Sequence, residues 1–208
     1  MAKEPGLNSA DALDGVEDVK KLYRDWADSY DSDFAAARGY ALHRHVAEAY
    51  ASAGGAGPVL DVGAGTGLVG EALASLGVSP VEGTDISAEM LEVALGKGCY
   101  AQTFVADITK RTDIADDTYA GIVSAGTFTL GHLGPEPLGE LIRITRPGGL
   151  IALAINAQHW DAAGFGAAFD ALGGMISDLR RDPVQIYADG ADHDHAADVG
   201  YITRFRVR

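Results

Sequence analysis

Val59-Leu60-Asp61-Val62-Gly63-Ala64-Gly65-Thr66-Gly67-Leu68 is the stretch that decides the fold class of this chain. An apolar strand runs into an acidic residue and three glycines at alternate positions, and a predicted helix over 68–76 follows at once. Glycine lets the backbone turn sharply and lets a ligand lie against bare main chain. Amides at the N-terminus of the next helix point at whatever lies there. The stretch therefore predicts a turn that binds a nucleotide-bearing ligand.

Two ligand classes compete for this turn. Residues 65–70 satisfy the G-x-G-x-x-G spacing of dinucleotide-binding proteins, and Asp85 follows at about the distance of a ribose-binding carboxylate. That fingerprint opens directly off its strand, whereas here Gly63 already begins the turn. The carboxylate of Asp61 would oppose a pyrophosphate but suits a ligand with an amino group and a sulfonium. The position of the first glycine relative to the strand and the charge of Asp61 both favour S-adenosylmethionine over NAD.

Four ordered segments carry a family resemblance. Asp61-Val62-Gly63-Ala64-Gly65-Thr66-Gly67 resembles the first motif of class I S-adenosylmethionine-dependent methyltransferases, and matches at 83–87, 106–108 and 144–150 follow in the expected order. The resemblance spans about 59–156. It implies a Rossmann-like three-layer α/β sandwich, with a seven-stranded, mostly parallel sheet whose last strand is antiparallel. Residues 124–133 are similar to the Williams–Beuren-region methyltransferase-like group, and 22–31 resemble the N-terminal helix of small-molecule members.

The same resemblance implies a set of cofactor-binding residues. Asp85 would accept both ribose hydroxyls, Asp107 would accept the adenine amine, and apolar side chains would sandwich the ring. Taken singly, each aspartate is also typical of a loop or a helix cap. The ordered set favours the binding role. Its members are Tyr23, Tyr30, Asp61, Gly63, Ala64, Gly65, Thr66, Gly67, Leu68, Asp85, Ile86, Met90, Ala106, Asp107, Ile108, Ser124, Ala125 and Gly126.

Aromatic and histidine side chains suggest two further features. Tyr23, Trp26 and Tyr30 share one face of a predicted helix over 16–30, which is more often a core stripe than a site. The functional alternative is a lid that closes over the cofactor and excludes water. His132 follows the fourth predicted strand, where it could act as a general base, although a plain loop histidine is the competing interpretation.

The bulk composition limits the partners. The chain has 208 residues, 47% of them hydrophobic, so we expect one domain over 1–208, with an N-terminal arm and lid helices over 1–56 and the core over 57–208. A net charge of −14 disfavours nucleic acid and favours a small-molecule substrate. No apolar run reaches membrane-spanning length, and a single cysteine suits a reducing cytoplasm. We therefore expect a cytoplasmic protein with no membrane partner. The sequence does not indicate an oligomeric state.

Strands and helices alternate along the chain, which predicts a parallel sheet covered on both faces. After a helix over 40–51, the expected strands are 59–62, 81–84, 101–105, 121–125 and 150–155, with helices over 68–76, 88–95 and 137–144. A helical stretch over 162–179 then leads to two late strands, 184–187 and 201–207.

Two motifs indicate what the site lacks. The cluster at 189–195 has three aspartates and two histidines but no metal-site spacing, so an acidic turn is favoured and no metal is expected. Ser124-Ala125-Gly126-Thr127 also differs from the loop of methyltransferases that act on base amines.

Many relatives place an acid just before the fourth strand. This chain has none there, and Asp116 or Asp117 is the expected substitute.

The sequence thus predicts methyl transfer from S-adenosylmethionine to a small molecule by in-line displacement, without metal. Two other classes stay open: a non-catalytic S-adenosylmethionine-binding protein and an NAD-dependent oxidoreductase.

Overall fold

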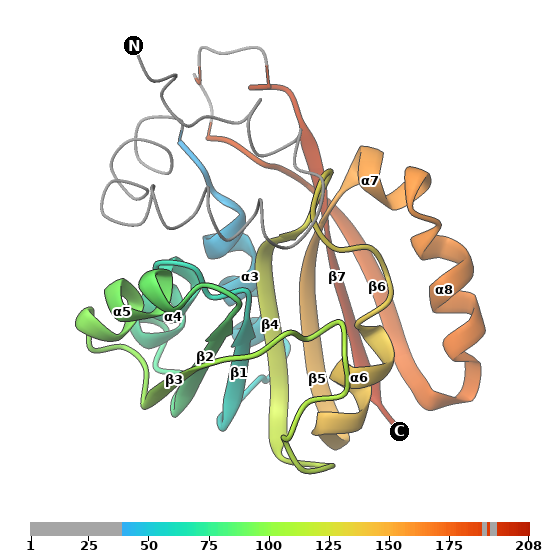
Figure 1. Ribbon diagram of the computed structural model, residues 1–208. Coiled ribbons are helices and arrows are strands. Elements are labelled where there is room, and N and C mark those ends of the chain that lie inside the picture. Colours follow the sequence, from blue (N-terminus) through green and yellow to red (C-terminus); the bar gives the residue numbers. More distant parts are fainter. Residues whose placement is uncertain (1–38, 189–190, 192–194) are drawn as a thin grey trace.

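The computed structural model describes residues 39–188, 191 and 195–208. These residues form a seven-stranded sheet of order β3-β2-β1-β4-β5-β7-β6 (Figure 1). Strands β1 to β5 are parallel, and β7 is antiparallel to both β5 and β6. The predicted sheet, with its antiparallel last strand, is therefore confirmed. The strands are β1 (Val59–Val62), β2 (Val81–Asp85), β3 (Gln102–Val105), β4 (Tyr119–Phe128), β5 (Thr145–Asn156), β6 (Ile176–Gln185) and β7 (Val199–Val207).

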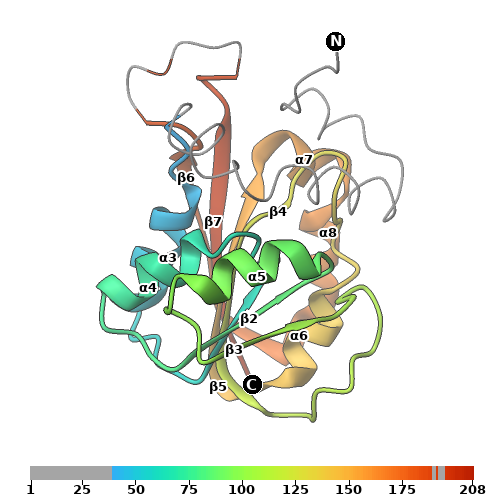
Figure 2. The same cartoon turned by 60° about the vertical axis from the view of Figure 1, so that its left-hand side comes forward.

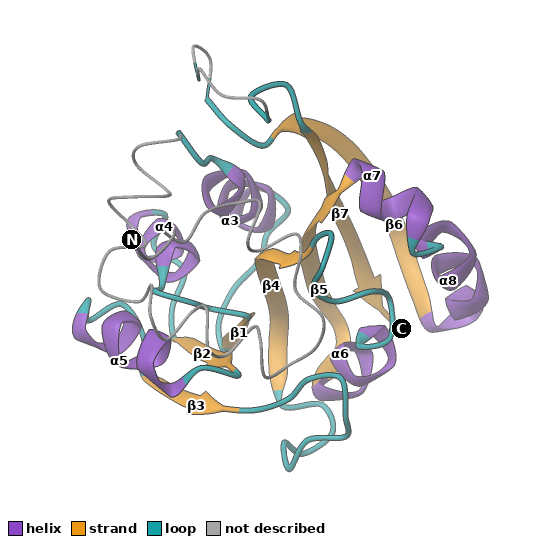
Figure 3. Ribbon diagram, turned by 45° about the horizontal axis from the view of Figure 1, so that its top comes forward, coloured by secondary structure: helices purple, strands orange, loops and turns teal. Residues whose placement is uncertain are grey.

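Helices cover both faces of the sheet (Figures 2 and 3). One face packs against α3 (Leu42–Ser52), α4 (Leu68–Ser75) and α5 (Ala88–Gly96). The other packs against α6 (Leu138–Ile144), α7 (Ala157–Ala162) and α8 (Phe165–Leu172). Strand β1 is buried along its whole length, as a central parallel strand between two helical layers must be. Its one charged residue, Asp61, is therefore buried in the middle of the fold.

Helix α3 is anchored to β7 at its C-terminal end. A helix ends with carbonyl groups that lack intrahelical partners, and the last turn of α3 has no basic residue of its own. Two arginines of β7 reach over to it: Arg206 donates to the carbonyl of Ala53 at 2.8 Å, and Arg204 donates to that of Ala49 at 3.5 Å. These bonds attach the N-terminal helical layer to the last strand.

The helical stretch predicted over 162–179 is correct only where α8 forms, and it is wrong from residue 173 onward. The chain forms α7 and α8 on either side of Gly164, which has a positive φ of 73°, and α8 stops at Gly173, with a φ of 45°. Residues 176–185 then form β6, which pairs with β7 over nearly its full length. Pairing with a distant strand outweighs the local helical pattern here. The late strand predicted over 184–187 is thus the end of β6 and the segment after it, where Tyr187 forms an isolated bridge with Tyr40.

The order of the strands reverses between β1 and β4, and in open α/β sheets ligands bind outside the carboxyl ends of the strands at such a point. The predicted helix over 16–30 lies outside the described residues. Within the part that is described, no helix is both long and apolar enough to span a bilayer.

Candidate functional site

A cavity opens at the carboxyl ends of β1, β2 and β4, where the strand order reverses. Its walls come from the turn after β1, the loops after β2 and β3, the end of β4 and the start of α3. Most of the predicted site residues that the structure describes line this cavity. They are Gly63, Ala64, Gly65, Thr66, Leu68, Asp85, Ile86, Met90, Ala106, Asp107, Ile108, Ala125, Gly126 and His132.

Positive φ angles at alternate glycines shape the turn after β1. Gly63, Gly65 and Gly67 have φ values of 69°, 53° and 94°, a region that other residues rarely adopt. The space beside Gly65 is open, because a Cβ built there would meet no atom within 4 Å. At Gly63 the corresponding space is filled by the hydroxyl of Thr127 from β4. The turn therefore exposes bare main chain to the cavity mainly at Gly65.

Asp85 ends β2 and reaches back to the turn. Its Oδ2 accepts a hydrogen bond from the amide of Gly65 at 2.9 Å, and its Oδ1 accepts one from the amide of Ser87 at 3.0 Å. Burial raises the pKa of this carboxyl, while the amide donors and the charge of protonated His132 lower it. Each oxygen keeps a second lone pair, so the carboxylate can still accept hydrogen bonds from a ligand.

Asp107 lines the cavity from the loop after β3, and residues of the same loop bind its carboxylate. Its Oδ1 accepts from both the amide and the hydroxyl of Thr109, and its Oδ2 forms an ion pair with Lys110 at 2.7 Å. These donors lower the pKa of Asp107, chiefly the Lys110 ammonium and the Thr109 hydroxyl. The carboxylate is therefore ionised and fixed at the edge of the cavity.

The end of β4 forms the remaining wall. The pairing of β4 with β5 is irregular between Ser124 and Phe128, and Gly126 has a φ of 82°. Such irregularities redirect side chains at the ends of strands, and here residues 125–127 face the cavity. His132 follows, with its Nδ1 3.2 Å from the carbonyl oxygen of Leu130. With the proton on Nδ1, that carbonyl accepts it and Nε2 carries the lone pair.

Three residues from the predicted set do not line the cavity. Ser124 is buried and donates its hydroxyl to the carbonyl of Val62 at 2.6 Å, so it joins β4 to β1 instead of facing a ligand. Gly67 and Asp61 lie behind the turn, on the side away from the cavity. Tyr23 and Tyr30, together with Trp26, lie outside the described residues.

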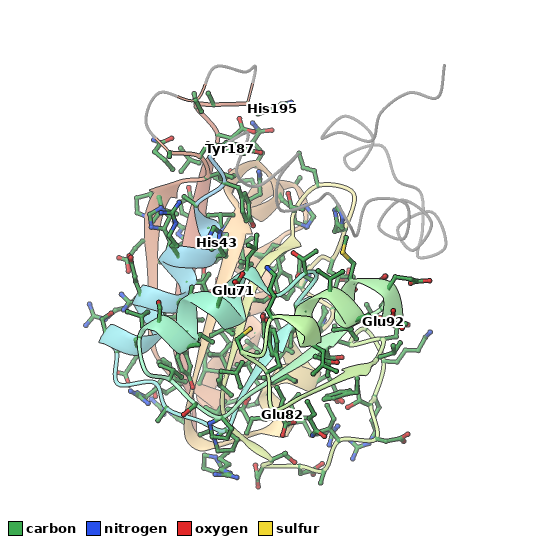
Figure 4. The ribbon with its side chains drawn as sticks, turned by 90° about the vertical axis from the view of Figure 1, so that its left-hand side faces the viewer. His43, Glu71, Glu82, Glu92, Tyr187 and His195 are labelled. Carbon is green, nitrogen blue, oxygen red and sulfur yellow. The ribbon has the colours of Figure 1, made fainter. Side chains whose placement is uncertain are left out.

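Tyr40, His43 and Thr127 line the cavity but were not predicted from the sequence. Tyr40 and His43 stack with their ring centroids 5.7 Å apart, and Tyr40 meets the ring of Tyr187 edge-on. His43 and Tyr187 lie toward the same end of the molecule (Figure 4). The bridge between residues 40 and 187 brings this wall together, and a contact over such a separation leaves no periodic signal in the sequence.

Tyr100 is a further residue that sequence reasoning missed. It is buried between α5 and β3, and its ring occupies the space that a Cβ at Gly70 would fill, 2.4 Å from the ring carbon Cζ. The third glycine of the apparent dinucleotide fingerprint is thus explained by a tyrosine packed against α4.

Asp116, which with Asp117 was expected to substitute for the missing acid before β4, belongs to a network of ion pairs. It forms ion pairs with Arg143 of α6 and, at 3.3 Å, with Arg111. Arg143 also pairs with Glu140 at 2.6 Å, and Glu140 accepts from the amide and hydroxyl of Thr112. This network fixes the segment that leads into β4. Among the described residues, no group of three or more histidine, cysteine or acidic side chains is placed to hold a metal. Most of the 189–195 cluster lies outside them.

Residues 59–149 match the family model of the methyltransferase domain. The chain is 29% identical over 155 residues to methyltransferase-like protein 27 of Homo sapiens, covering 71% of this chain and 62% of that protein. It is 35% identical over 103 residues to the malonyl-[acyl-carrier protein] O-methyltransferase of Pectobacterium atrosepticum, covering 48% and 39%. The alignments thus span less than two thirds of either relative. A putative S-adenosylmethionine-dependent methyltransferase from Methanococcus maripaludis shares the fold, with a TM-score of 0.61 at 19% identity over 90% of this chain and 93% of that one.

Proposed function

Because this chain belongs to the class I S-adenosylmethionine-dependent methyltransferases, we propose that it transfers a methyl group from that cofactor to a small-molecule acceptor. The observation that carries the proposal is the cavity at the point where the strand order reverses. The glycine turn, Asp85 and Asp107 all line it. It combines an open stretch of main chain with one carboxylate at the end of β2 and another in the loop after β3.

The residues of the cavity fit the cofactor. Gly65 leaves room for the methionine portion to lie against the turn, and Asp85 has lone pairs for the ribose hydroxyls. Met90 and Ile108 are buried apolar side chains on the wall where an adenine ring would lie. Among the described lining residues there are two carboxylates and no lysine or arginine, which suits a cationic sulfonium and opposes a pyrophosphate.

The chemistry of transfer needs little covalent help from the protein. S-adenosylmethionine supplies an electrophilic methyl group on a sulfonium. The chain contributes proximity and orientation, with the turn and Asp85 fixing the cofactor while Tyr40, His43 and Thr127 bound the space beside it. His132 is proposed as the general base. When its Nδ1–H donates to the carbonyl oxygen of Leu130, its Nε2 carries the lone pair that can accept a proton.

Charge and composition support a small acceptor. At a net charge of −14 the chain would be repelled by nucleic acid, so a small neutral or cationic molecule is the acceptor class we propose. The single cysteine, Cys99, suits a reducing compartment, and we propose the cytoplasm.

Transfer of labelled methyl groups tests this proposal. The protein is incubated with methyl-labelled S-adenosylmethionine and, separately, with the low-molecular-weight fraction, the nucleic acids and the proteins of a cell extract. Label is expected in the first fraction, and a His132→Gln variant should incorporate it at least tenfold more slowly. Label in nucleic acid or protein would refute the small-molecule acceptor. Cofactor binding without transfer to any fraction would favour the non-catalytic alternative.

A further inference from the structure

A buried tyrosine supports the cofactor turn from behind. Tyr100 follows α5 and is 6% exposed, and it does not line the cavity. Its ring fills space that three glycines leave vacant: a Cβ would lie 2.9 Å from the ring at Gly67, 2.4 Å at Gly70 and 3.1 Å at Gly83. These glycines belong to the turn, to the first turn of α4 and to β2. The ring therefore packs at the point where the three elements meet.

The hydroxyl of Tyr100 joins two of the groups that shape the turn. It donates to Oδ2 of Asp61 at 2.6 Å and accepts from the amide of Gly70 at 3.1 Å. Asp61 precedes the turn on β1, and Gly70 lies in the helix that follows it. One hydroxyl group thus ties together the two ends of the 63–67 segment, which lines the cavity at 63–66.

Asp61 depends on this bond. Its side chain is fully buried, and its Oδ1 has no hydrogen-bond partner among the described residues. Burial raises the pKa of Asp61, the hydrogen bond from Tyr100 lowers it and the charge of Asp85 raises it, and together they bring it to about 7. Burial raises the pKa of the neighbouring Cys99 thiol, and the charges of Glu71 and, to a smaller extent, Asp61 raise it as well. Tyr100 therefore favours the ionised form of a buried carboxylate that directly precedes the turn.

We propose that Tyr100 is a positioning residue for the cofactor: by holding Asp61 and the amide of Gly70, it keeps the turn in the form that receives S-adenosylmethionine. The inference rests on the proposed function for the identity of the ligand. It adds a residue outside the glycine motif, on a different element, that acts on the ligand through Asp61.

Tyr100→Phe tests the inference, with Tyr119→Phe as the matched control. Tyr119 is also buried and donates to a carboxylate, Glu82, at 2.7 Å. It begins β4, at the edge of the sheet opposite to the cavity, and Glu82 lies well away from His43 (Figure 4). The Kd of S-adenosylhomocysteine is measured by calorimetry from pH 6 to 9 for both variants and for the wild-type chain. The ratio of variant to wild-type Kd removes the titration of the ligand itself.

The expected result has a pH dependence that lost packing would not produce. Without the donor, Asp61 stays protonated to higher pH, so Tyr100→Phe should weaken binding about tenfold at pH 7. The ratio of the Tyr100→Phe Kd to the wild-type Kd should fall toward one at pH 9, where Asp61 is ionised in both proteins. Adding Tyr100→Phe to an Asp61→Asn chain should give a Kd ratio that does not change with pH, because asparagine accepts a hydrogen bond but has no charge to titrate. Tyr119→Phe should leave the Kd unchanged at every pH.

Several outcomes would overturn the inference. A Tyr100→Phe ratio near one, a ratio that does not change with pH, or an equal loss in Tyr119→Phe would each show that Tyr100 has no specific role in binding. A wild-type chain that binds neither S-adenosylhomocysteine nor S-adenosylmethionine would refute the proposed function itself, and this inference with it.

Discussion

Replacing Gly70 by alanine reverses the usual effect of that substitution in a helix. At a helical position with free space, alanine stabilises by up to about 1 kcal/mol relative to glycine. Gly70 has no such space, because a Cβ would lie 2.4 Å from Cζ of Tyr100 and 2.6 Å from its hydroxyl oxygen. The ring is buried, so it cannot swing into solvent. We therefore expect Gly70→Ala to destabilise the chain.

The expected loss in free energy of unfolding is the sum of two costs, less the gain in helix propensity. Overpacking of this kind costs about 1–3 kcal/mol. Displacing the Tyr100 hydroxyl leaves the buried carboxylate of Asp61 without its donor, at a cost of about 1–3 kcal/mol. With about 1 kcal/mol of propensity gain subtracted, the net loss is about 3 kcal/mol at the centre of the range. In a chain of this size, that lowers Tm by roughly 6–12 °C.

Thermal unfolding followed by circular dichroism measures this effect, with Gly139→Ala as the control. Gly139 also lies near the start of a helix, α6, but no atom lies within 4 Å of its missing Cβ. It should follow the ordinary rule and raise Tm slightly. If Gly70→Ala were as stable as the wild-type chain or as Gly139→Ala, the packing of Tyr100 against α4 would be wrong.

Three further predictions concern the elements around the site. Ser87→Ala removes the hydroxyl that caps α5 and should lower the free energy of unfolding by about 1 kcal/mol in urea, and an unchanged midpoint would show that the cap contributes nothing. The Arg143 guanidinium lowers the pKa of Glu140 to about 2, so the ionised carboxylate stabilises the fold above the unfolded value near 4.5 and this stability is lost as the pH falls toward 2. Glu140→Gln should therefore be less stable than the wild-type chain at pH 6 and closer to it at pH 3, and an equal urea midpoint difference at the two pH values would contradict the ion pair. Arg206→Met keeps the apolar stem but removes the donor to the C-terminal end of α3, which should cost about 1 kcal/mol. A Tm equal to that of the wild-type chain would contradict the anchoring of α3.

Local patterns in the sequence predicted the alternating strands and helices and the glycine turn, and the family resemblance implied the seven-stranded sheet with its antiparallel last strand. A buried parallel strand followed by a glycine turn and a helix has a strong local signature, and each acidic residue at a strand end has a fixed place in the topology. Asp85 and Asp107 therefore meet at one cavity, as the order of the motifs indicated.

Long-range contacts could not be predicted in the same way. The helix expected over 162–179 gives way to β6 because β7, more than 20 residues further on, supplies its hydrogen-bonding partner. Ser124 was assigned to the ligand because the strand was expected to end at residue 125, whereas β4 continues to Phe128 and buries that hydroxyl against β1. Tyr100 could not be predicted as part of the site because its hydrogen-bond partners are 30 and 39 residues away in sequence.

Calorimetric titration with S-adenosylmethionine, S-adenosylhomocysteine and NAD tests the central claim most directly. It is made on the wild-type chain, on Asp85→Ala and on Asp170→Ala, which removes an exposed carboxylate from α8. The wild-type chain and Asp170→Ala should bind the first two ligands with micromolar Kd and should not bind NAD, whereas Asp85→Ala should lose at least tenfold in affinity. Binding of NAD alone, or equal binding of S-adenosylmethionine by all three proteins, would contradict the assignment of this cavity to the methyl donor.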